Sequence, residues 1–253
     1  MMYAPMLRLN ALVAIGCVSI ALGACAMDRS PLVTSAILDP ARPAADTARD
    51  ADRKPGDMLV FARVKPRETV VDFLPGKGYF TRLFSVAVGP TGAVYAVTPQ
   101  IYVDAHKGAT LPSIAGEPGH GNVHDIVAPY DTLGLPVQAD LVWTSQNYHD
   151  VHVWAGPEAA ARLNKAVFQA LKPGGLYVIL DHAGPAGLDE AGIKKLHRID
   201  EATVIREVEA AGFLPDVESF VLRNPSDPHT ANVFDPSIRG KTDQFLLRFR
   251  KPS

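Results

Sequence analysis

The sequence is poor in the features on which disulfide-stapled, nucleic-acid-binding and membrane-spanning proteins depend. Its 253 residues include two cysteines, Cys17 and Cys25, so the rest of the chain forms no internal disulfide and needs a buried core for stability. It has no dense run of lysine and arginine, and its formal net charge of -2 gives no electrostatic reason to expect nucleic acid as a partner. Its longest apolar run, Leu9–Leu22, is short for a helix that spans a bilayer. The 47% of hydrophobic residues suits a globular protein with one sizeable core.

The first residues have the pattern of a bacterial export signal. Arg8 precedes the apolar run, and the run ends in Leu22-Gly23-Ala24-Cys25. This tetrapeptide resembles the lipobox of bacterial lipoproteins, in which small residues precede a cysteine that receives diacylglycerol. An ordinary secretory signal with an incidental cysteine is the alternative. Ala26, where an Asp would retain the protein at the inner membrane, favours the outer membrane by resemblance to sorting rules.

These observations divide the chain into three parts. Residues 1–24 are the predicted lipoprotein signal peptide, removed before lipid is attached to Cys25. Residues 25–54 are rich in Ala, Asp, Arg, Pro and Ser without a sustained apolar period, which predicts a tether. Residues 55–253 are the predicted folded domain. We therefore expect a membrane partner through lipidated Cys25 and a location at the periplasmic face of the outer membrane.

Within the folded part, short apolar runs alternate with helical patterns, which predicts a parallel sheet with helices on both faces. The expected fold class is α/β: a Rossmann-like, doubly wound, mostly parallel seven-stranded sheet with an antiparallel C-terminal strand pair. The expected strands are Thr69–Leu74, Ala93–Val97, Val123–Val127, Asp140–Thr144, Leu176–Leu180, Pro215–Leu222 and Gln244–Phe249, and the clearest helices are Tyr79–Val88, Pro157–Leu171 and Asp200–Ala211.

A glycine-rich turn follows the first strand, where an open α/β sheet places a nucleotide. The turn is Pro75-Gly76-Lys77-Gly78 and leads directly into a helix. A dinucleotide fingerprint requires Gly or Ala three positions after Gly78, where Thr81 stands. A Walker loop ending in Gly240-Lys241-Thr242 fails because Asp235 replaces its first glycine and no strand precedes it.

The turn resembles that of the class I S-adenosylmethionine (SAM) dependent methyltransferases, usually Asp-x-Gly-x-Gly-x-Gly, with Asp72, Gly76 and Gly78 at matching positions and Leu74 in place of the first glycine. The resemblance extends over residues 60–252, and Lys172-Pro173-Gly174-Gly175 is its most specific segment. The closing run 242–251, with Asn147-Tyr148-His149-Asp150, resembles a group of predicted, often exported methyltransferases that carry a lipoprotein signal.

The resemblance implies SAM as the cofactor. Asp72, Gly76 and Gly78 border its methionine end, and Asp131 matches the acid that contacts adenine. Thr98-Pro99-Gln100 stands where an acid usually binds the ribose hydroxyls, and a neutral side chain pairs more weakly there. The candidate cofactor-binding residues are Asp72, Pro75, Gly76, Gly78, Thr98, Asp131 and Asn147.

A second polar group is expected at the same edge of the sheet. Ser145-Gln146-Asn147-Tyr148-His149-Asp150 leaves the carboxyl end of the fourth strand, and His182 follows the fifth. Histidine can accept a proton near neutral pH, Asp150 can orient His149, and Tyr148 can contact a substrate. Tyr148, His149, Asp150 and His182 are therefore the candidate catalytic residues. Because loops at this edge are rarely needed for the core, we expect His149 and Asp150 to be dispensable for folding.

Metal binding is the weaker interpretation of the histidines. His149, Asp150 and His152 are spaced as metal ligands often are, and His120, His124 and His182 could add nitrogen ligands. No HExxH or paired CxxC motif occurs, so no metal site is predicted.

Two polar residues further along the chain have other candidate roles. Asp200 could cap the helix that follows it, and Arg198 could hold an anionic substrate.

The sequence thus predicts a SAM-dependent methyltransferase that acts on a small molecule or an envelope component. The alternative is an exported protein of the same fold that does not use SAM, either a binding protein or a hydrolase based on His149 and Asp150. The missing glycine at Leu74 and the missing ribose acid favour the alternative, whereas the intact Gly76 and Gly78 favour the methyltransferase.

Overall fold

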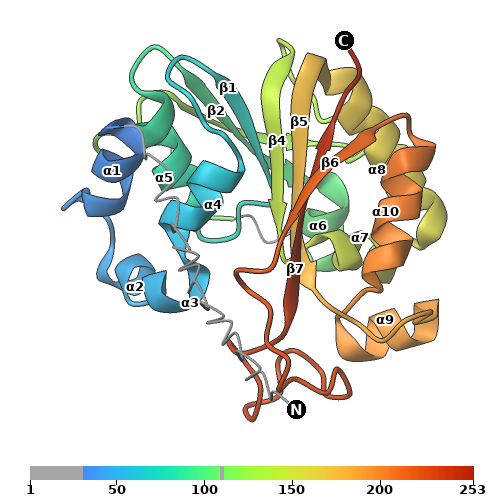
Figure 1. The fold of residues 1–253 in the computed structure, drawn as a ribbon. Coiled ribbons are helices and arrows are strands. Elements are labelled where there is room, and N and C mark those ends of the chain that lie inside the picture. The colour runs from blue at the N-terminus through green and yellow to red at the C-terminus, as the bar shows by residue number, and fades with distance from the viewer. Residues whose placement is uncertain (1–30, 109–110) are drawn as a thin grey trace, which may run out of the picture.

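A computed structural model describes residues 31–108 and 111–253, and a seven-stranded sheet lies at its centre (Figure 1). The strand order is β3-β2-β1-β4-β5-β7-β6. β1 to β5 are parallel, whereas β7 is antiparallel to both β5 and β6. This topology confirms the predicted fold class, including the C-terminal antiparallel pair. The strands are β1 (Thr69–Phe73), β2 (Ala93–Pro99), β3 (Val123–Ala128), β4 (Ala139–Ser145), β5 (Leu171–His182), β6 (Leu214–Ser219) and β7 (Gln244–Arg250).

Helices cover both faces of the sheet, as Figure 1 shows. α1, α4 and α5 pack on one face, and α7, α8 and α10 on the other. The helices are α1 (Pro31–Leu38), α2 (Ala44–Thr47), α3 (Asp50–Arg53), α4 (Pro55–Phe61), α5 (Tyr79–Val88), α6 (Gln100–Ala105), α7 (Tyr148–Ala155), α8 (Pro157–Ala170), α9 (Glu190–Leu196) and α10 (Glu201–Ala210). None of these helices is long and apolar enough to cross a membrane.

The central strands are apolar on both faces because helices bury both faces. In β1, Val70 packs into the core on the α5 side, while Val71 and Phe73 pack into the core on the α8 side. Such two-sided burial explains the continuous apolar run that marked this strand in the sequence. Chain order reverses between β1 and β4, and the carboxyl ends of strands at such a switch point form the ligand crevice of doubly wound sheets.

Residues 31–54 differ from the sequence prediction. The tether predicted over residues 25–54 is wrong for this part, which forms α1, α2 and α3, with α1 packed on α5 and α4. Two ion pairs hold this segment in place. Arg42 Nη2 lies 2.6 Å from Asp50 Oδ1, and Nη1 of Arg82, in α5, lies 2.9 Å from Asp46 Oδ2. The segment therefore belongs to the folded domain. The predicted signal peptide and Cys25 lie outside the described residues.

Candidate functional site

A cavity of about 600 Å³ opens at the carboxyl ends of β1 and β4. The glycine-rich turn after β1 and the residues that follow β4 line it together, as predicted from the sequence. The segment 45–53 and the loop around Arg239 line it as well. Among the predicted cofactor-binding residues, Asp72, Pro75, Gly76 and Asn147 contribute to the cavity.

Asp72 is the buried acid of this cavity. It is 3% exposed, and its Oδ2 accepts a hydrogen bond of 2.7 Å from the hydroxyl of Thr81. Burial raises the pKa of Asp72 to about 6, against the opposing effects of the Thr81 hydrogen bond and of the Arg53 charge. A buried carboxyl group with so few partners in a cavity is typical of a ligand site.

We expect Asp72→Asn to raise the free energy of unfolding by about 3 kcal/mol near pH 8. Because the pKa of this acid is higher in the folded protein than in the unfolded chain, its ionisation opposes folding. That penalty is absent below about pH 4, grows between about pH 4 and pH 6, and is complete above. Asn keeps an acceptor for Thr81 and removes the charge.

Urea unfolding near pH 8 and near pH 4 measures this effect, and the difference between the two proteins should shrink toward the lower pH. Thr81→Val is the matched variant, since it keeps the carboxyl group but removes its hydrogen bond, and it should be less stable than the wild type near pH 8. A less stable Asp72→Asn protein near pH 8 would show that the ionised carboxylate stabilises the fold.

The two glycines of the turn have different surroundings. Gly76 has a φ of +59°, and a Cβ placed there would meet no atom within 4 Å. Gly78 has a φ of +82°, and its Cβ would lie 2.3 Å from Ile114 Cδ1. Gly76 therefore leaves open space, whereas Gly78 is required by the close packing of Ile114 rather than by space for a ligand.

Arg53 is a cation of the cavity that the sequence analysis missed. Its Nη2 donates to Oε1 of Gln146 at 2.9 Å, and its guanidinium lies over the Tyr79 ring, 4.7 Å from the centroid. Its Nε is buried without a hydrogen-bond partner, and no carboxylate of the described residues forms an ion pair with it. Burial lowers the pKa of Arg53 to about 10. Its position in a segment predicted as a tether hid this residue.

Asn147 holds the turn as well as lining the cavity. Its Nδ2 donates to the carbonyl oxygen of Leu74 at 3.0 Å. Leu74 takes the place of the first glycine of the methyltransferase pattern and has a φ of +58°, a conformation that costs most side chains about 1–2 kcal/mol. The hydrogen bond from Asn147 helps to fix this strained residue.

Three predicted cofactor-binding residues do not line the cavity: Gly78, Thr98 and Asp131. Thr98 is 6% exposed at the end of β2, and Asp131 is exposed in the turn after β3. Neither lines the cavity that contains Asp72 and Gly76. The structure thus brings together the predicted residues for one end of the cofactor but not those for its adenosine end.

The predicted catalytic residues lie near the same edge of the sheet, but none of them lines the cavity. His149 is 2% exposed, and its Nδ1 lies 2.7 Å from Oδ1 of the fully buried Asp181. Burial lowers the pKa of His149, but the Asp181 and Asp150 carboxylates outweigh it and hold the pKa at about 10. This burial contradicts the expectation that His149 is a loop residue without importance for folding.

Tyr148 is a core residue, so its predicted contact with a substrate is wrong. It is fully buried, donates to Glu207 Oε2 at 2.8 Å and accepts from Asn164 Nδ2 at 2.8 Å. His182 is half-buried, and its Nδ1 lies 2.7 Å from Thr242 Oγ1. Burial lowers the pKa of His182 to about 4, so its ring is neutral near pH 7.

The structure also decides the two hypotheses on Asp200 and Arg198. Asp200 caps α10, as expected, by accepting from the backbone amide of Ala202. Arg198 is fully buried and pairs with Asp227, Nη1 to Oδ2 at 2.8 Å, so it does not hold a substrate.

His152 lies between Glu190 and Glu207 rather than with His149. The sequence did not predict the residue that does join His149 and Asp150, which is His197.

Solved structures match this arrangement over most of the chain. A SAM-dependent methyltransferase from Aquifex aeolicus is 19% identical with a TM-score of 0.54, and the match covers 86% of this chain and 97% of that one. An arsenic(III) S-adenosylmethionine methyltransferase from Chlamydomonas reinhardtii is 18% identical with a TM-score of 0.52, covering 88% of this chain and 74% of that one. This chain has the methyltransferase fold. No protein-family model and no curated protein matches the sequence.

The methyltransferase fold does not by itself decide the reaction. The [4+2]-cyclase SpnF matches as well, with 17% identity and a TM-score of 0.52, covering 83% of this chain and 81% of that one. Folds of this kind host several chemistries, and the function has to be argued from the site.

Proposed function

We propose that this chain binds SAM and transfers its methyl group to a small molecule or an envelope component. The observation that carries the proposal is the cavity at the carboxyl ends of β1 and β4, where the buried Asp72 meets the open turn at Gly76. Open α/β sheets bind their ligands at such a switch point, and the similarity in fold to known methyltransferases supports the same use.

The charges of the cavity suit the methionine part of SAM. That part carries an ammonium and a carboxylate group, and the cavity offers the Asp72 carboxyl group and the Arg53 guanidinium, neither of which has an ion-pair partner among the described residues. Gly76 would let the backbone approach the ligand closely, and Asn147 would hold the turn. SAM supplies an activated methyl group, so the protein needs mainly to position the acceptor and exclude water.

The adenosine part has weaker recognition. Thr98 and Gln100 stand where an acid usually pairs with the ribose hydroxyls, and Asp131 is exposed outside the cavity. We therefore expect a lower affinity than a ribose carboxylate would give. Calorimetric titration of the purified protein with SAM and with its demethylated product tests the proposal. Each should bind with a stoichiometry of one, and the absence of binding at millimolar SAM would refute it.

A second candidate is a binding protein for an anionic small molecule. Four basic side chains line the same cavity: Arg49, Arg53, Lys77 and Arg239. SAM is made in the cytoplasm, so a location of this protein outside the cytoplasm would also favour the binding protein. Binding of phosphate or a small carboxylate without binding of SAM would replace the first candidate. A hydrolase based on His149 and Asp150 has less support because the buried His149 does not reach the cavity.

The membrane anchor remains part of the proposal. Cys25 follows the lipobox-like sequence, so we expect lipid on Cys25 and a location at the periplasmic face of the outer membrane. Metabolic labelling with palmitate should mark the wild type and Cys17→Ser, which keeps the lipid site, but not Cys25→Ser. Equal labelling of the wild type and Cys25→Ser would exclude the anchor.

A further inference from the structure

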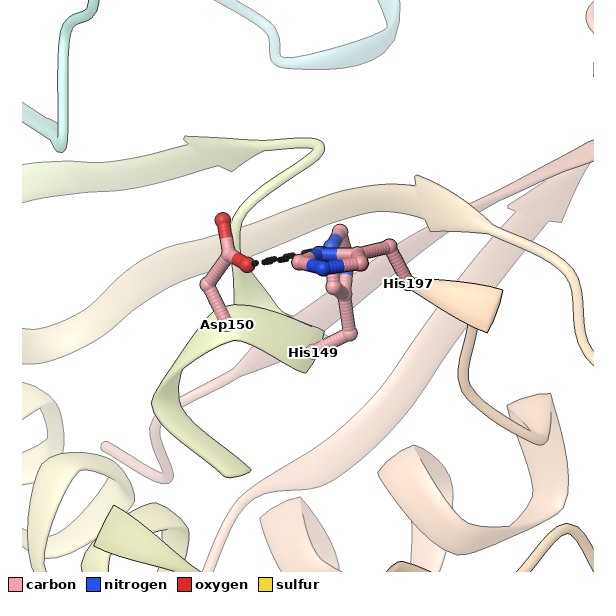
Figure 2. Close-up of side chains that lie close together, drawn as sticks. All are labelled: His149, Asp150 and His197. Carbon is pink, nitrogen blue, oxygen red and sulfur yellow. Dashed lines mark hydrogen bonds and ion pairs between the residues drawn. The ribbon is translucent and has the colours of Figure 1, made fainter. Parts of the chain in front are cut away.

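Three potential metal ligands meet beside the C-terminal end of β5. His149 and Asp150 belong to the first turn of α7, and His197 follows the last residue of α9. Figure 2 shows the carboxylate of Asp150 directed toward the two imidazole rings. Asp150 Oδ1 lies 3.3 Å from His149 Nε2 and 3.3 Å from His197 Nδ1, and one ligand atom from each residue lies within 4.8 Å of the others.

These separations suit a metal ion at the centre of the group. Bonds of about 2.0–2.1 Å to nitrogen and oxygen place two ligands of a tetrahedral ion about 3.3 Å apart. Both distances from Asp150 have this value. The side chains of Asp150 and His197 are 19% and 25% exposed, so an ion can reach the group from solvent.

Asp181, on the Nδ1 side of the His149 ring, has the position of a residue that orients a metal-ligating histidine. Asp181 is fully buried, and its carboxylate accepts from the backbone amides of His149 and His182 as well as from His149 Nδ1. Because a carboxylate only accepts, Nδ1 of His149 carries a proton and Nε2 is the nitrogen that faces Asp150. Carboxylate, histidine and metal form such a chain in many metal sites.

An unsatisfied atom points into the same group. His149 Nε2 is buried and forms no hydrogen bond within the part of the chain that the structure describes, although Asp150 Oδ1 lies 3.3 Å away.

We propose that His149 Nε2, Asp150 and His197 Nδ1 bind a divalent transition-metal ion, with Zn²⁺ as the probe that best fits two imidazoles and one carboxylate. Three protein ligands leave a fourth position for water or for a nitrogen, oxygen or sulfur atom of a ligand. The inference does not depend on SAM binding, because none of the three residues lines the cavity of the proposed cofactor site.

His197 offers a variant that separates metal binding from folding. Its φ is +52°, at the C-terminal cap of α9, where glycine is the residue most often found. His197→Gly therefore removes a ligand and at the same time relieves backbone strain, so the metal-free variant should be no less stable than the wild type. His106→Ala, which removes an exposed histidine outside the group, is the control.

The full-length protein, freed of metal by a chelator, is titrated with Zn²⁺ by calorimetry and with Co²⁺ by visible absorption. We expect one equivalent of Zn²⁺ for the wild type and His106→Ala, intense bands of four-coordinate Co²⁺, and an affinity at least about a hundredfold lower for His197→Gly and Asp150→Asn. Absence of stoichiometric binding to the wild type would overturn the proposal. So would full affinity in His197→Gly, which would place the ion on other groups, the two cysteines included.

Discussion

Replacing His149 by alanine is expected to lower the free energy of unfolding of the metal-free protein by about 3–5 kcal/mol. His149 is 2% exposed, and its ring lies 2.7 Å from the carboxylate of Asp181, which is fully buried. Removing the ring leaves that carboxylate in the core without its charged partner, a change that costs far more than the loss of one exposed ion pair. Urea unfolding near pH 7 in the presence of a chelator measures the effect.

His182→Ala is the matched control. His182 lies beside His149, with ring centroids 5.8 Å apart, but its ring is neutral and hydrogen-bonds Thr242. Its loss should cost about 1 kcal/mol, the contribution of one hydrogen bond. If His149→Ala were no more destabilising than His182→Ala, the pair of His149 and Asp181 would not support the core, and its geometry would be better explained by function alone.

The fold was predictable because its signals are local. The apolar runs of β1 and β4, the turn from Pro75 to Gly78 and the helix after it can all be recognised from consecutive residues, and connection rules then leave few topologies. The meeting of the Gly76 turn with Asn147 follows from the parallel order of β1 and β4, since carboxyl ends of neighbouring parallel strands share one edge.

The helices α2 and α3 were not predictable in the same way. Each has four residues, too few to show an amphipathic period, and helices of that length are not stable alone. They are held by contacts made with distant residues, such as the ion pair of Asp46 with Arg82. The same long-range packing brings Arg53 into the cavity, which no local pattern indicated.

The candidate site was predicted in part for a related reason. His149 and Asp150 are adjacent in the sequence and were recognised together, whereas His197 joins them only because α9 returns beside α7. Gly78 was predicted to border the cofactor, but it packs against Ile114, which comes from a segment without a regular pattern. Sequence indicates which residues share an element, and tertiary packing decides which side chains meet.

Gly76→Asn is expected to lower the affinity for SAM by at least about a hundredfold, or about 2.7 kcal/mol, with little change in stability. Gly76 has a φ of +59°, which asparagine tolerates better than most residues, so the cost in folding should be about 1 kcal/mol or less. The new side chain would meet no protein atom at its Cβ and would project from a residue that lines the cavity, where the ligand is expected to approach the backbone.

Gly187→Asn is the matched control for this prediction, because Gly187 has a φ of +70°, equally open surroundings and a position outside the cavity. Both variants should lose the same small amount of stability in urea, and calorimetry should show a loss of SAM binding for Gly76→Asn alone. Gly78→Ala cannot serve here, since its Cβ would collide with Ile114 and disturb the fold before it affects a ligand. Binding of SAM to Gly76→Asn with wild-type affinity would mean that the turn after β1 does not hold the cofactor, and the proposed use of this cavity would be wrong.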